Sequence, residues 1–186
     1  MKRLKVICIM GKSGTGKSTV VKELCKNDIF NYVKSFTTRK ERINDPSDKE
    51  THVFVSKDHY LECEKKSEIL ALYVSKNDYV SYTTKKSFDK EKINIYVIDP
   101  IAFNDFSKLK GFDVTGIYLK IDEKERTNRF FNREKNLNKF SKEEELDESQ
   151  IHVNNYFSID VTNLKVTQVC DIIEGDYDKR IKKNIW

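Results

Sequence analysis

The chain has 186 residues and a formal net charge of +5 at pH 7, a size that fits one domain, or one core with a small inserted lobe. Its 35 basic and 30 acidic residues mostly alternate, which favours a salt-bridged surface over a nucleic-acid partner. No apolar run approaches the length of a membrane span or a signal peptide, so we expect no membrane partner. The four cysteines lack metal-ligand spacing, and we interpret them as reduced thiols of a cytoplasmic protein.

The first predicted elements are a buried strand at residues 6–10 and a helix from Ser18, joined by a glycine-rich loop. The loop, Gly11–Ser18, is a complete G-x-x-x-x-G-K-[ST] pattern, whose backbone N–H groups can surround an anion at the positive end of the helix dipole. There Lys17 would reach the β- and γ-phosphates of ATP, and the Ser18 hydroxyl would bind Mg²⁺. The alternative is a glycine turn that only joins strand and helix. The residues expected to bind ATP are Gly11, Ser13, Gly14, Thr15, Gly16, Lys17, Ser18 and Thr19.

Residues 31–86 have a different composition, rich in threonine, serine, tyrosine and charge. Short apolar alternations, such as residues 52–55, predict a small mixed lobe inserted after the first helix and facing the phosphate loop. Arg39 and Arg42 are three residues apart, and two guanidinium groups could clamp one phosphate dianion. Taken alone, the pair could also be exposed surface arginines.

Strands and helices alternate after this lobe. We predict strands at residues 93–98, 114–121 and 157–161, a helix at residues 122–133 capped by Asp122, and a last helix from about Asn163. This alternation predicts an α/β fold in which a parallel sheet is covered by helices on both faces. Asp99 follows the first of these strands, at the carboxyl end where parallel sheets bind ligands.

Three segments resemble the guanylate kinase family, in order and at nearly the family's spacing: residues 11–19, 35–42 and 52–56. The likeness extends over most of the chain. It implies a three-layer P-loop NTPase core with a parallel sheet, an inserted acceptor-binding lobe and a lid. It also implies reversible transfer of the γ-phosphoryl group of ATP to GMP with Mg²⁺. On this resemblance residues 1–186 form one domain, with core segments 1–30 and 87–186, a lobe at about 31–86 and a lid at about 129–150.

The resemblance also implies roles for individual residues. The acceptor site would contain Ser35, Arg39, Arg42, His52, Tyr79, Ser81 and Asp99, with Arg39 and Arg42 on the phosphate. His52 stands where the family usually has a tyrosine, and a neutral imidazole can still donate one hydrogen bond.

The catalytic residues implied by the resemblance are Lys17, Arg39, Arg129 and Arg133. Arg129 and Arg133 match the first two lid arginines, and their spacing of four places them on one face of the predicted helix, where they could converge on the phosphoryl group. Taken alone, they could be helix-end charges favoured by the dipole. The third lid arginine has no match, because residues 142–148 are mostly acidic.

The sequence departs from the family where the acceptor base is read. Leu70 stands where the family normally has a glutamate for the guanine N1 and N2 hydrogens, and Glu68 is two residues away. A leucine cannot accept those hydrogen bonds, so ribose 1,5-bisphosphate stays open as an acceptor beside GMP. A non-catalytic binding module also stays open. A GTPase is disfavoured, since the D-x-x-G at residues 113–116 lies in a predicted strand and no N-K-x-D motif follows.

Overall fold

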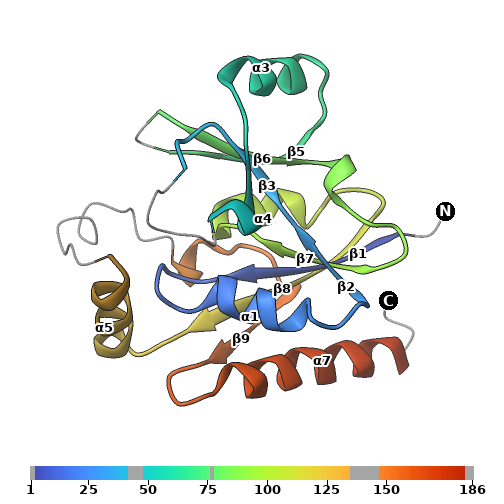
Figure 1. Ribbon diagram of the computed structural model, residues 1–186. Helices are drawn as coiled ribbons and strands as arrows, with labels where there is room; N and C mark the ends of the chain where they lie inside the picture. The colour runs from blue at the N-terminus through green and yellow to red at the C-terminus, as the bar shows by residue number, and fades with distance from the viewer. Residues whose placement is uncertain (1–2, 42–47, 76–77, 135–146, 183–186) are drawn as a thin grey trace.

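The computed structural model describes residues 3–41, 48–75, 78–134 and 147–182, except for the side chains of 130–134 and 181–182 (Figure 1). The strands are β1 (Leu4–Met10), β2 (Phe30–Val33), β3 (Ser35–Thr37), β4 (His52–Phe54), β5 (Ile69–Val74), β6 (Val80–Thr84), β7 (Ile93–Val97), β8 (Phe112–Lys120) and β9 (Tyr156–Asp160). The α-helices are α1 (Lys17–Leu24), α2 (Asp48–Thr51), α3 (Lys57–Lys65), α4 (Pro100–Phe106), α5 (Glu123–Glu134) and α7 (Val166–Lys182). Two short 3-10 helices are η1 (Lys85–Ser87) and η2 (Glu148–Gln150).

A five-stranded parallel sheet, in the order β2-β7-β1-β8-β9, forms the core. β1 lies in the middle because its residues 6–10 are a continuous apolar run, which suits a strand covered on both faces. α1 and α7 pack together on one face, where Val20, Val21 and Val169 are buried (Figure 1). α4 covers the other face with Phe103 and Phe106. The predicted parallel sheet with helices on both faces is confirmed.

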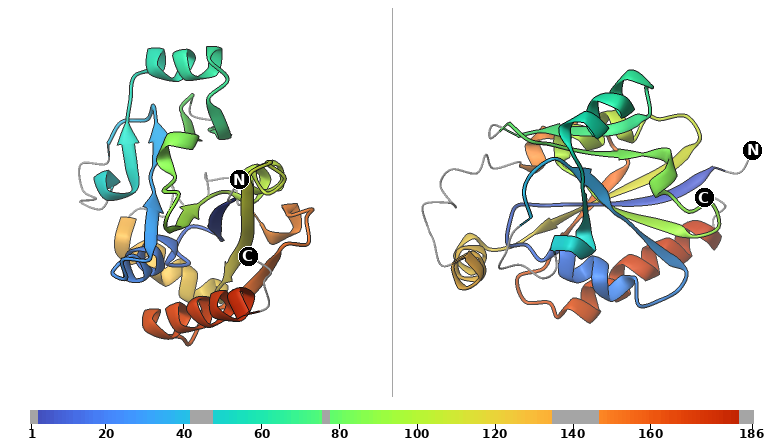
Figure 2. Two further views of the ribbon diagram at one scale, coloured as in Figure 1. Left: turned by 90° about the vertical axis from the view of Figure 1, so that its right-hand side faces the viewer. Right: turned by 45° about the horizontal axis from the view of Figure 1, so that its top comes forward.

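A second, four-stranded mixed sheet, in the order β4-β3-β6-β5, forms the lobe inserted between β2 and β7. α3 covers its outer face, where Phe36 stacks on Tyr82 with ring centroids 5.4 Å apart. His59 of α3 shares a 2.6 Å hydrogen bond with Tyr82 Oη. In the left view of Figure 2, α3 and α7 lie at opposite ends of the molecule, with both sheets between them.

The lobe begins later than the sequence predicts. β2 pairs with β7, with Phe30 opposite Ile93, so residues 31–33 belong to the core sheet and the second sheet begins at Ser35. Phe30 and Val33 are buried, and their packing in the core decides which sheet the strand joins.

The last helix also begins later than predicted, at Val166 instead of near Asn163. The backbone N–H of Leu164 donates to the Val161 carbonyl in a turn, and that of Lys165 donates to Gln168 Oε1 at 2.9 Å. These bonds satisfy backbone groups just ahead of the helix. Among the helices of the described segments, none combines the length and apolar character needed to cross a membrane.

Gly116→Ala is expected to lower the free energy of unfolding by about 1–3 kcal/mol, because the added methyl group overpacks the core. A Cβ at Gly116 in β8 would lie 2.5 Å from Phe103 Cζ and 2.7 Å from Tyr156 Cβ. Gly175 in α7 is the matched control, because its Cβ would meet nothing within 4 Å. Gly175→Ala should stabilise the helix by about 0.5–1 kcal/mol. Urea unfolding measures both changes, and equal stabilities of the two variants would contradict this packing.

Candidate active site

The loop between β1 and α1 depends on glycine at three positions. Gly14 and Gly16 have φ values of 90° and 91°, in the left-handed region where a side chain is strained. Gly16 is also the N-cap of α1. At Gly11, with φ 143°, a Cβ would lie 2.7 Å from the carbonyl oxygen of Leu119 in β8. The glycines therefore allow the loop to turn tightly over the carboxyl ends of β1 and β8.

Lys17 folds back against this loop. Its Nζ donates hydrogen bonds to the carbonyl oxygens of Gly11 at 2.6 Å and Lys12 at 2.9 Å. The ammonium charge is thus held at the start of α1, beside the positive end of the helix dipole. Ser18 and Thr19, in the first turn of α1, are exposed, so both hydroxyls are accessible to a ligand. This arrangement suits a polyphosphate and its divalent cation.

The core sheet places Asp99 beside the loop. Ile9 of β1 pairs with Val97 of β7, so Gly11 and Asp99 each lie two residues beyond that pair. Asp99 Oδ1 accepts a 2.8 Å hydrogen bond from the Ala102 backbone N–H and caps α4. Burial raises the pKa of the Asp99 carboxyl, and the backbone N–H groups it accepts from act in the opposite direction. Asp99 therefore has a structural role as a cap, beside the acceptor role predicted for it.

Strand pairing brings three predicted acceptor residues to one face of the lobe sheet. Ser35 of β3 pairs with His52 of β4, and Thr37 of β3 pairs with Ser81 of β6. Paired residues share a face, as do residues two apart in one strand. Ser81 Oγ donates to Thr37 Oγ1 at 2.9 Å. Since α3 covers the opposite face, Ser35, His52 and Ser81 all lie on the face turned away from α3.

Ser35 also connects the lobe to the core. Burial raises the pKa of the Tyr96 phenol, with the Asp99 carboxylate acting in the same direction and a hydrogen bond with Ser35 acting against them. Ser35 and Asp99 therefore both lie near Tyr96. Tyr79 precedes β6 and packs against Tyr73 of β5, with ring centroids 6.4 Å apart. The structure thus places Tyr79 on the lobe, next to the edge strand.

Arg39 is held by a buried carboxylate. Its Nη1 donates to Asp48 Oδ2 at 2.6 Å, and its Nη2 donates to Asp48 Oδ1. The Arg39 side chain is 12% exposed and that of Asp48 only 2%. The guanidinium lies over the Phe54 ring, 5.2 Å from its centroid, and 3.5 Å from His52 Nδ1. Arg39 is therefore engaged by Asp48, and its predicted partner Arg42 lies outside the described residues.

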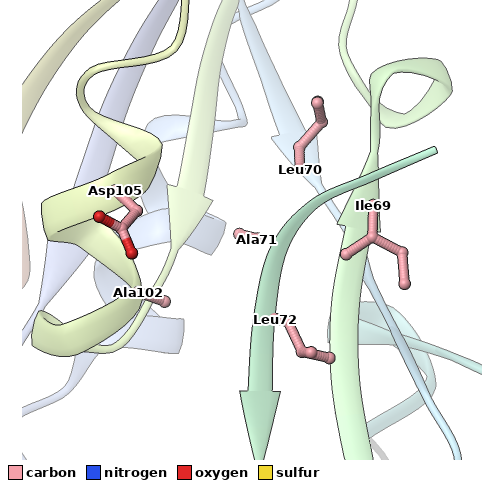
Figure 3. A pocket seen from close by; sticks show the side chains of 6 residues that line it. All are labelled: Ile69, Leu70, Ala71, Leu72, Ala102 and Asp105. Atoms are coloured by element: carbon pink, nitrogen blue, oxygen red, sulfur yellow. The ribbon is translucent and has the colours of Figure 1, made fainter. Parts of the chain in front are cut away.

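An open cavity of about 220 Å³ lies between β5 and α4 (Figure 3). Its lining residues are Ile69, Leu70, Ala71 and Leu72 from β5, and Ala102 and Asp105 from α4. Leu70 also packs against the buried core cluster, so this wall of the cavity is apolar. Glu68 pairs instead with Lys86 Nζ, at 3.6 Å. The carboxylate of this cavity comes from α4, at Asp105.

Comparisons with known proteins assign the family. Residues 7–152 match the AAA domain family. The chain belongs to this family. A guanylate kinase from Clostridium tetani (strain Massachusetts / E88) is 36% identical over 104 residues, which are 53% of this chain and 49% of that protein. The match thus spans about half the length of this curated relative.

The fold of this AAA domain protein is that of a guanylate kinase-like P-loop protein. The crystal structure of guanylate kinase from Anaplasma phagocytophilum superposes with a TM-score of 0.65 at 18% identity, covering 96% of this chain and 87% of that one. Such coverage includes the lobe sheet as well as the parallel core. The predicted guanylate kinase resemblance and the predicted fold class are confirmed.

The predicted lid arginines of this AAA domain protein lie in α5. Arg129 Nε donates to Glu125 Oε1 at 2.9 Å, and both side chains are partly exposed. Arg133 belongs to α5, but its side chain and residues 135–146 lie outside the described part of the chain. Convergence of the two arginines on a phosphoryl group stays a prediction.

Three residues contact the site without any motif that predicts them. Arg126 Nη1 donates to the Ser13 carbonyl oxygen at 3.2 Å. Asp147 pairs with Lys12 Nζ at 3.5 Å, and Asp48 holds an arginine nine residues before it. In each pair the partners lie at least nine residues apart in the sequence, beyond the spacing of one helical turn. In the sequence, the only sign of these residues is their charge, and a charge alone does not show which residue it will contact.

Proposed function

We propose that this protein is an ATP-dependent phosphotransferase that acts on a nucleoside monophosphate, with GMP as the first acceptor to test. The observation that carries the proposal is the complete phosphate loop, with Lys17 folded against it and Ser18 exposed. A separate lobe presents Ser35 and Ser81 on one face, as an acceptor site requires. Membership of the AAA domain family and the guanylate kinase-like fold support the same assignment.

The proposed reaction needs no general base, because the acceptor phosphate is already an anion. Lys17 Nζ would leave the loop carbonyls and bind the β- and γ-phosphates, while the loop N–H groups bind phosphate oxygens. The exposed Ser18 hydroxyl fits Mg²⁺, which supplies charge neutralisation and alignment of the phosphates. Arg39 and Arg129 would stabilise the charge spread over the loose transition state.

A sugar phosphate such as ribose 1,5-bisphosphate is the second candidate acceptor. The apolar wall at Leu70 favours it, because guanine donors buried there would lack a partner from β5, at a cost of about 1–3 kcal/mol each. Among the six lining residues, Asp105 alone is charged. Guanine recognition would therefore depend on groups outside β5.

An ADP-release assay with GMP, dGMP, AMP and ribose 1,5-bisphosphate tests the proposal. We expect the wild type to fall short of the roughly 10⁴- to 10⁵-fold preference of a site that pairs every base hydrogen. Leu70→Glu should raise kcat/KM for GMP relative to AMP, because it adds a carboxylate to the cavity wall. Val74→Glu adds the same charge to β5 at a position 65% exposed, and should leave the ratio unchanged.

A wild type strictly specific for GMP would show that another group reads the base and that the Leu70 alignment is wrong. A wild type that binds ATP but phosphorylates no acceptor in the panel would contradict the kinase proposal and favour a binding module.

A further inference from the structure

The most buried charge near the phosphate loop is the guanidinium of Arg126, among the residues that the structure describes. Arg126 is 2% exposed, although it lies in α5, a helix on the outside of the core (Figure 1). Its Nε donates to Glu123 Oε2 at 2.9 Å, and its Nη2 donates to Glu123 Oε1. The Glu123 side chain is 60% exposed, so this ion pair could form equally well in solvent. Burial of the arginine therefore needs another explanation.

The explanation lies in the third hydrogen bond of the guanidinium. Arg126 Nη1 donates to the carbonyl oxygen of Ser13, inside the phosphate loop, at 3.2 Å. A trans peptide is planar, with its C=O and N–H on opposite sides. Fixing the Ser13 carbonyl toward Arg126 therefore turns the Gly14 N–H away from α5. Gly14 lacks a Cβ, so without this contact its backbone could adopt conformations other than the one observed, which has a φ of 90°.

A second contact holds the neighbouring loop residue. Lys12 Nζ pairs with Asp147 Oδ2 at 3.5 Å, and Asp147 caps η2 by accepting from the Ser149 backbone N–H. The Ser149 N–H and, after it, the Lys12 charge lower the pKa of the Asp147 carboxyl. Two successive residues of the loop are thus anchored to elements that follow β8.

We propose that Arg126 is a positioning residue for the phosphate loop: it holds the Ser13–Gly14 peptide so that the Gly14 N–H is aimed at the phosphates of ATP. The proposal rests on the proposed function, because it assumes that the loop binds ATP. Arg126 acts through the backbone of the loop and does not itself contact the nucleotide.

Nucleotide binding in three variants tests this role. Arg126→Gln removes the charge. Arg126→Lys keeps the charge but lacks the planar guanidinium whose separate nitrogens reach Glu123 and Ser13. Arg180→Gln removes an ion-paired arginine of α7 as a matched control. Calorimetric titration with ADP and Mg²⁺ should show about 10- to 100-fold weaker binding for both Arg126 variants, and no change for the control. The KM for the acceptor should stay at its wild-type value.

The six glycines of the chain allow a direct readout of the peptide itself. In protein labelled with ¹⁵N-glycine, the Gly14 amide signal should shift in Arg126→Lys without any nucleotide, while Gly175, in α7, keeps its position. A Gly14→Ala variant assigns the signal. Thermal unfolding of each variant identifies the temperature range in which it is folded, and the spectra are compared within that range.

Three outcomes separate the possibilities. An unmoved Gly14 signal together with wild-type ADP affinity in folded Arg126→Lys overturns the positioning role and leaves the proposed function standing. A shifted signal with weakened ADP binding supports the positioning role, whichever acceptor the enzyme uses. A wild type that binds neither ADP nor ATP overturns both the proposed function and this inference.

Discussion

Lys17→Ala is expected to lower kcat for phosphoryl transfer by about 10²- to 10³-fold, because it removes a positive charge aimed at the transferring group. In the structure Lys17 Nζ donates to the backbone carbonyl oxygens of Gly11 and Lys12 in the loop. Lys17 belongs to neither buried core cluster, so the variant should fold with nearly unchanged stability. Steady-state kinetics with each active acceptor measure the loss.

Lys26→Ala is the matched control for this change. Lys26 follows α1, is 70% exposed and pairs with Glu23 at 2.7 Å, away from the loop. Its removal should change kcat less than twofold, because an exposed pair contributes only about 0–1 kcal/mol. Near-normal turnover in folded Lys17→Ala, with every acceptor that the wild type uses, would rule out the kinase mechanism.

Asp48→Ala is expected to lower the free energy of unfolding by about 3–5 kcal/mol, because it leaves the mostly buried Arg39 guanidinium without its carboxylate partner. The Asp48 side chain is 2% exposed and accepts from both Nη atoms of Arg39. The double variant Arg39→Ala/Asp48→Ala should lose less than the sum of the two single changes, since neither charge is then left unpaired. Glu41→Ala is the control, because the Glu41–Lys49 pair is exposed and should contribute less than about 1 kcal/mol.

Kinetics of the same variants separate the structural role of Arg39 from acceptor binding. If Arg39 holds the acceptor phosphate, Arg39→Ala should weaken acceptor binding by about 1.5–3 kcal/mol and leave ATP affinity unchanged. The measurements are made below the unfolding temperature of each variant. Equal losses for ATP and for the acceptor would count against acceptor binding by Arg39. Additive stability losses in the double variant would instead count against the Arg39–Asp48 ion pair.

Local patterns in the sequence were sufficient to predict the core of this protein. The apolar run of β1, the glycine pattern of residues 11–18 and the start of α1 are adjacent in the chain, and each is encoded by nearest-neighbour sterics and periodicity. The alternation of strands and helices then predicted a parallel sheet, which the structure has. Boundaries were less predictable, as at β2, where burial of Phe30 against the core decided which sheet the strand joined.

The candidate site was only partly predictable for a different reason. Motifs predict which residue types the site contains, but the contacts of each side chain depend on a partner from another element. Arg39 could be identified as a phosphate-binding candidate, but not as the partner of Asp48, which lies nine residues later, on α2. Leu70 could be identified as a departure from the guanylate kinase pattern. The sequence did not show that the carboxylate lining the same cavity is Asp105, which comes from α4.

The sequence by itself determined the phosphate loop, the fold class and the family resemblance, because these depend on residues close together in the chain. Only the tertiary structure decided that Arg126 is buried against Ser13, which is 113 residues away along the chain. Burying a guanidinium is unfavourable unless hydrogen bonds compensate it, and those bonds exist only once α5 has packed beside the loop. The sequence therefore shows which charged residues lie near the phosphate loop in the chain. Their orientation follows only from packing between elements that are far apart in the sequence.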